Sequence, residues 1–149
     1  MVSPMVISDA WHWTGVHWHG YVIARADSAC PLLRCRSARL ARVPDAVLVD
    51  PVAVADWIEQ HTRAHLYPRQ TWAPADQRWV RCGDAEDLAR SRRMHLAIAS
   101  RGDSLYLDIP TATGVLFLFV EAVTDEHCLH PHTTDPTDEE GDGASAGTA

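Results

Sequence analysis

The pattern of apolar and polar residues predicts strands near both ends of the chain. Residues 16–26 (VHWHGYVIARA) are rich in β-branched and aromatic types, which is typical of a strand. Three further apolar runs, at 94–99, 105–109 and 115–123, are separated by turn sequences and are also predicted to be strands. Residues 32–43 (LLRCRSARLARV) fit a strand or a helix, and the hairpin-like connection ADSACP before them favours the strand.

The clearest helix is predicted over residues 51–66. Asp50 is a good N-cap for it, and Pro51 suits its first position, where no amide bond is lost. One face carries a stripe at helical spacing, formed by Val54, Trp57, Ile58, His61 and His65. A second, short helix is predicted from Asp84 to the basic residues 90–93, and YPRQTWAPADQRWV before it is predicted to be a loop over the core.

These elements predict a single α+β domain over residues 1–124. It contains a mostly antiparallel sheet of four to five strands, one main covering helix and one short helix. A chain of 149 residues is long enough to bury such a core without disulfides. From residue 125 onward the composition shifts to Thr, Pro, Asp, Gly, Ser and Ala, so residues 125–149 are predicted to be an acidic disordered tail.

The charges divide in the same way. All 13 basic residues are Arg and lie before residue 102, and seven of the 20 acidic residues lie in the tail. The remaining 13 acids balance the 13 Arg, so the tail carries the whole net charge of −7. Lys and Asn are absent, which predicts a gene from a high-GC bacterium. No apolar run is long enough for a membrane helix and no signal peptide is recognised, so we expect a cytoplasmic protein without a membrane partner.

The aromatic N-terminal stretch WHWTGVHWHG predicts a contact strand. Trp11, Trp13 and Trp18 supply more apolar area than one strand face can bury, so we expect them to meet a protein partner or a second copy. A local basic patch is predicted nearby, at Arg34, Arg36, Arg39 and Arg42. Such a patch suits phosphates, but the neutral domain and the anionic tail do not favour nucleic acid.

Histidines provide the candidate metal ligands. His17 and His19 are two residues apart and share one face of an extended strand, and His61 and His65 are one helical turn apart. These four are the predicted ligand set for zinc or another transition metal. Two His supply only half of a tetrahedral set, so our first expectation is a structural strand without a preformed metal site or cofactor.

A second group of potential ligands lies where the tail begins. It consists of His127, Cys128, His130 and His132, in the stretch EHCLHPH. A flexible His tract binds metal weakly and without specificity, so this group is not part of the predicted set.

Two short stretches resemble a known family. TGVHWHGYV resembles the copper-binding stretch of multicopper oxidases, and EHCLHPH is similar to their later His-Cys-His motif. The resemblance implies that His17 and His19 are copper ligands. The chain departs from the family because it lacks a second His-x-His strand motif and is too short for two or three cupredoxin domains. We therefore do not assign it to that family.

No catalytic constellation stands out, so we predict no catalytic residues. Gly-rich phosphate loops, a nucleophile elbow and spaced carboxylate pairs are all missing. Small proteins without motifs in high-GC bacteria are often accessory proteins of mobile elements. The first predicted function is therefore a non-catalytic accessory or interaction protein of a plasmid, phage or other mobile element, acting in its transfer or maintenance. The alternative is a small transition-metal-binding protein with His and Cys ligands, and the third is nucleic-acid contact through an Arg-rich sheet face.

Overall fold

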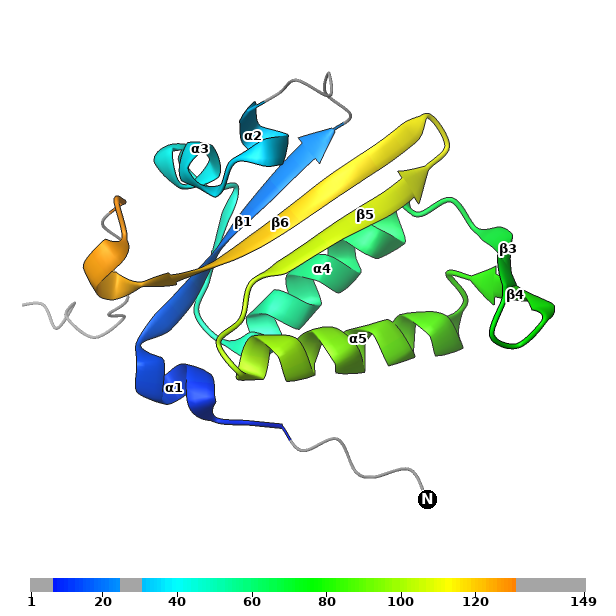
Figure 1. Cartoon of the computed structure of the whole chain (residues 1–149), viewed down its shortest axis with the longest axis horizontal. Coiled ribbons are helices and arrows are strands. Elements are labelled where there is room, and N and C mark those ends of the chain that lie inside the picture. The colour runs from blue at the N-terminus through cyan, green and yellow to red at the C-terminus, as the bar shows by residue number, and fades with distance from the viewer. Residues whose placement is uncertain (1–6, 25–30, 131–149) are drawn as a thin grey trace, which may run out of the picture.

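The structure is a computed structural model, and it describes residues 7–24 and 31–130. It has the predicted α+β fold, built on a four-stranded antiparallel sheet in the order β2-β1-β6-β5 (Figure 1). The strands of this sheet are β1 (Val16–Ala24), β2 (Ala46–Leu48), β5 (Leu105–Thr111) and β6 (Gly114–Thr124). A separate hairpin consists of β3 (Arg69–Ala73) and β4 (Arg78–Cys82).

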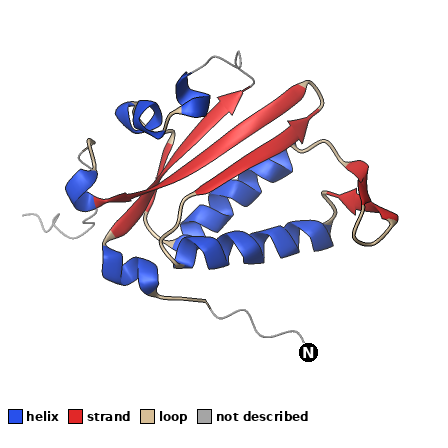
Figure 2. Ribbon diagram, viewed as in Figure 1, coloured by secondary structure: helices blue, strands red, loops and turns tan. Residues whose placement is uncertain are grey.

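Two long helices cover one face of the four-stranded sheet. They are α4 (Pro51–His65) and α5 (Ala85–Ser100), which pack against each other. The shorter helices of the described residues are α1 (Ala10–Thr14), α2 (Pro31–Arg34), α3 (Arg36–Ala41) and the 3-10 helix η1 (Asp125–His127). Figure 2 shows the hairpin and the pair α2 and α3 at opposite ends of the molecule. None of the helices in the described ranges has the length and apolar character needed to cross a membrane.

Helix α4 confirms the clearest prediction from the sequence. The Asp50 side chain caps it by accepting a hydrogen bond of 2.7 Å from the Ala53 amide, and Pro51 occupies the first turn. Val54 and Ile58 are buried in the core, as their place on the apolar stripe predicts. The helix therefore begins and packs as the sequence indicates.

The prediction of a strand over residues 32–43 was wrong, because this segment forms α2 and α3. Arg36 and Arg39 are three residues apart, so a helix turns both guanidinium groups to one side, where both reach the Glu121 carboxylate. A strand would have placed them on opposite faces.

Two further predictions, for residues 67–80 and 94–99, were also wrong. Residues 94–99 continue α5, which runs for 16 residues, because Leu88, His95 and Ala99 recur at helical spacing on one buried face. The predicted loop before α5 is the β3–β4 hairpin, closed by a turn in which Gln77 has a positive φ of 49°. The second covering helix, α5, is therefore long, and the polar segment before it forms a two-stranded sheet.

The central strand β1 is buried on both faces of the sheet. Trp18 of β1 and Leu118 and Val120 of β6 pack towards α4 and α5, in the main hydrophobic core. The intervening residues of these strands point to the opposite face, which explains why five consecutive residues of β1 are buried. This second face carries the polar groups described below.

A glycine in β1 allows the closest helix contact. A Cβ atom built on Gly20 would lie 2.9 Å from the Trp57 ring of α4, which is closer than side chains pack. We therefore expect Gly20→Ala to lower the free energy of unfolding by about 1–3 kcal/mol through overpacking, as measured by urea denaturation. Adding Trp57→Leu to this variant should cost less than the two separate losses summed; a full sum would contradict the contact.

Candidate metal centre

Two histidines of β1 face each other on the side of the sheet away from α4 and α5. His17 and His19 are buried, with 5% and 1% of their surface exposed. Alternation along the strand points both rings to the same side, and their Nε2 atoms lie 3.0 Å apart. The strand therefore holds two imidazole nitrogens close together without water between them.

A cysteine from the other end of the chain completes a cluster of three ligands. Residues 125–130 follow β6, which pairs with β1, and so bring Cys128 next to the two rings. Its Sγ lies 3.6 Å from His19 Nε2, and the three potential ligand atoms lie within 4.8 Å of one another. Two imidazoles and one thiol form a donor set that suits zinc and other borderline-soft metals.

Oxygen atoms hold the outer nitrogen of both rings. His17 Nδ1 lies 2.9 Å from Asp125 Oδ1, and His19 Nδ1 lies 3.4 Å from the Tyr21 hydroxyl. Metal-bound histidines in proteins almost always donate their other ring N–H to a carboxylate or another oxygen. With Nδ1–H donating to these oxygens, the Nε2 lone pairs of both rings would be available to a metal ion.

The Tyr21 hydroxyl can accept a hydrogen bond from His19 Nδ1. Burial, helped by the nearby negative charge of Glu121, raises the pKa of its hydroxyl to about 12. The protonated hydroxyl donates to the carbonyl of Arg42 at 3.5 Å, which leaves its oxygen able to accept from His19.

The segment after β6 is fixed by contacts of its own. The Cys128 thiol donates to the His130 carbonyl at 2.9 Å, and His130 Nε2 lies 3.2 Å from the Leu40 carbonyl. The His130 ring lies 6.1 Å from the His19 ring, measured between centroids. Residues 125–130, which we assigned to the tail, thus pack on the domain, and residues 131–149, with His132, lie outside the described residues.

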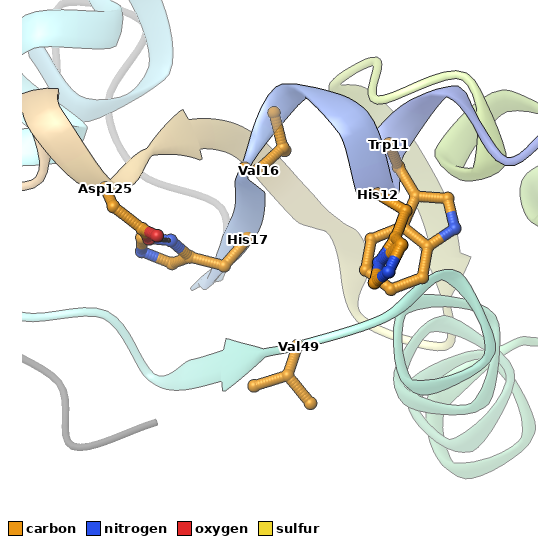
Figure 3. Close-up of a pocket in the computed structure, with 7 residues that line it drawn as sticks. Trp11, His12, Val16, His17, Val49 and Asp125 are labelled. Atoms are coloured by element: carbon orange, nitrogen blue, oxygen red, sulfur yellow. Dashed lines mark hydrogen bonds and ion pairs between the residues drawn. The ribbon is translucent and has the colours of Figure 1, made fainter. Parts of the chain in front are cut away.

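A pocket of about 270 Å³ opens beside the cluster. Figure 3 shows His17 and Asp125 at one end of it and Trp11 and His12 at the other, with Val49 on a third side. The Asp125 side chain is largely exposed here. The pocket therefore borders the His17–Asp125 pair, but its lining includes neither His19 nor Cys128.

The other predicted metal ligands lie elsewhere. His61 and His65 are on α4, which covers the opposite face of the sheet from His17 and His19. Their rings stack with centroids 5.9 Å apart, and burial, followed by the charge of His65, lowers the pKa of His61. Over the described residues, the potential metal cluster is His17, His19 and Cys128 alone, so the predicted set of four is not assembled.

The three tryptophans of the N-terminal stretch have different surroundings. Trp11 and Trp13 lie on α1, which precedes the predicted strand, while Trp18 lies in β1. Trp13 is 84% exposed, but Trp18 is fully buried, and its indole N–H donates to the Asp103 carbonyl at 3.0 Å. Trp18 is therefore a core residue and not available to a partner in this fold.

Most of the predicted basic patch is used inside the molecule. Glu121 is fully buried and accepts hydrogen bonds from Arg36, from Arg39 at 2.7 Å and from the Tyr106 hydroxyl at 2.8 Å. Arg42 pairs with Asp45 at 3.7 Å, and Arg34 is exposed. This cluster fixes α3 to the sheet beside the candidate metal centre and leaves little of the patch for phosphates.

Cys128 is the residue that the predicted set lacked. The stretch EHCLHPH was noted as metal-binding in type, but its position in an acidic, polar segment predicted a flexible tract. Cys128 could have been included only if the sequence had shown that residues 125–130 lie next to His17 and His19. That placement depends on the pairing of β1 with β6. In comparisons with known proteins, no family model, curated sequence or solved structure matches the chain.

Proposed function

We propose that this protein binds one transition-metal ion, zinc in the first place, through His17, His19 and Cys128. The observation that carries the proposal is that the three potential ligand atoms lie within 4.8 Å of one another. In both histidines, the other ring nitrogen is within hydrogen-bonding distance of an oxygen atom. Zinc is bound in proteins by His nitrogen and Cys sulfur in this way. This is the function that the sequence analysis gave as the alternative.

The number of ligands distinguishes the kind of site. Structural zinc sites usually have four protein ligands, whereas three ligands leave one tetrahedral position for water or an external molecule. The pocket beside His17 lies next to the site, although it is not lined by His19 or Cys128. The role as an accessory protein of a mobile element stays a prediction from the composition.

Metal binding is tested by titrating the metal-free full-length protein with zinc and with cobalt(II) as a spectroscopic probe. We expect one ion per chain, and at least a tenfold weaker binding in Cys128→Ser and in His17→Gln/His19→Gln. Asp125→Asn should weaken binding about 10–100-fold, because loss of a bonded carboxylate has this effect at other metal sites.

The chain offers matched controls for each variant. Cys82→Ser removes a half-buried thiol on the hairpin, and His61→Gln/His65→Gln removes two His on the opposite face of the sheet. Both controls should retain the affinity of the natural sequence. Equal binding by the Cys128→Ser variant, or equal losses in the controls, would overturn the proposal.

A further inference from the structure

The β3–β4 hairpin projects from the end of the molecule opposite α2 and α3 (Figure 1). One side of the ribbon, which we name the outer face, consists of Gln70, Trp72, Trp79 and Arg81, and all four are exposed. The opposite side carries the half-buried Thr71, Val80 and Cys82. The outer face is therefore the more exposed side of the hairpin.

Two indole rings dominate the outer face. Trp72 and Trp79 are directly paired across the strands, with ring centroids 5.8 Å apart and a T-shaped arrangement. They remain 47% and 64% exposed. Exposed aromatic rings are candidates for contact with a ligand that uses ring faces.

The hairpin carries three arginines that form no ion pair with a described residue. Arg81 is on the outer face opposite Gln70, whereas Arg69 and Arg78 pair with Cys82 and Ala73 and so belong to the other side of the ribbon, near its ends. All three are exposed, and the ion pairs found among the described residues use none of them. In contrast, Arg36, Arg39, Arg42, Arg63, Arg92 and Arg101 each have a carboxylate partner.

We propose that the outer face of the hairpin binds single-stranded nucleic acid. Unpaired bases stack on exposed aromatic rings whatever their sequence, and free guanidinium groups attract the phosphates between them. Apart from the two rings the outer face has no apolar residue, so it lacks the aliphatic centre of a typical protein interface. A polyanion with flat bases matches both parts of this surface.

Acidic residues limit the path that the strand takes. A pocket between the hairpin and the start of α5 is lined by Trp79 and Arg81 of the outer face, by Arg78 and Arg90, and by Asp76 and Glu86 together with two carboxylates at the helix start, Asp84 and Asp87. Both carboxylates are engaged in capping the helix, where Asp84 accepts from the Asp87 amide and Asp87 from the Gly83 amide. The four carboxylates repel phosphates there, so in this proposal the strand lies over the paired rings and passes Trp79 and Arg81 at the edge of the pocket without entering it.

The test measures binding of the full chain to fluorescently labelled oligothymidylate and oligouridylate at low salt, by anisotropy. We expect Trp72→Ala/Trp79→Ala to weaken binding at least tenfold, because each stacked base contributes strongly to affinity. Arg81→Gln should reduce the slope of log affinity against log salt concentration by about 0.7, the value for one phosphate contact on a single strand. These side chains are exposed, so the variants should keep the melting temperature of the natural sequence.

Two variants serve as matched controls. Trp13→Ala removes another exposed ring, and Arg101→Gln removes an exposed Arg that pairs with Asp103. Neither should change the affinity, and nor should His17→Gln/His19→Gln at the candidate metal centre. Absence of binding at low salt, tighter binding to a duplex of the same length, or equal affinity in Trp72→Ala/Trp79→Ala would overturn the proposal. Self-association lost in the same variant, without oligonucleotide binding, would identify the outer face as a contact between copies instead.

Discussion

Replacing Glu121 with Ala should lower the free energy of unfolding by about 3–5 kcal/mol, as measured by urea denaturation. Glu121 is fully buried, and Arg39 is buried with 5% of its surface exposed. Removal of the carboxylate leaves this guanidinium in the interior without an anionic partner, although it still lies 4.1 Å above the Phe119 ring. It also removes the ion pair of Arg36, which then keeps only its hydrogen bonds to the Ala122 carbonyl, at 2.7 Å, and the Ser104 hydroxyl.

Two variants separate loss of this pair from loss of packing. Glu59→Ala removes a half-exposed carboxylate that binds Arg63 and Arg92 on the surface, and it should cost well under 1 kcal/mol. Glu121→Leu combined with Arg39→Met replaces both charges by apolar groups and should recover much of the stability. A loss at Glu121 no larger than that at Glu59 would contradict a buried ion cluster.

The Trp18→Ala variant should lose about 3–5 kcal/mol of unfolding free energy because it leaves a cavity in the main core. The ring is fully buried between α4 and the sheet, and its N–H is bonded to the Asp103 carbonyl. In Trp13→Ala, where the ring is 84% exposed, the change should stay within about 0.5 kcal/mol. Thermal or urea unfolding of the two variants, side by side, checks the difference; similar losses would mean that the register of β1 is wrong.

The elements predicted correctly from the sequence are those with strong local signals. Helix α4 has a capping Asp50, a first-turn Pro51 and a clear stripe, and β6 has an apolar run with few polar residues. Residues 94–99 were misassigned because a short, mostly apolar run, interrupted only by His95, fits a buried strand and a helix end equally well. Only the packing of α5 against α4 decides between them.

The candidate site could be predicted only in part. The shared orientation of His17 and His19 follows from the alternation of a strand and required no tertiary information. Cys128 contacts His19 from 109 positions further along the chain, and Asp125 contacts His17 from 108 positions further along. No local sequence pattern links residues that are so far apart. Similarly, the sequence presents Arg36 and Arg39 as a surface patch until the fold places Glu121 between them.

The pairing of β1 with β6 has a consequence for synthesis of the protein. The register joins Val16 to Thr124 and Ala24 to Leu116, so the central pair of the sheet cannot form until nearly all of the described chain has left the ribosome. At elongation rates of about 5–20 residues per second, β1 waits on the order of 5–20 s for its partner strand. During this time Trp18, Tyr21 and the two histidines of β1 are without their native neighbours. A nascent-chain chaperone, or excess metal ions in the cell, can therefore bind β1 before the rest of the protein has folded.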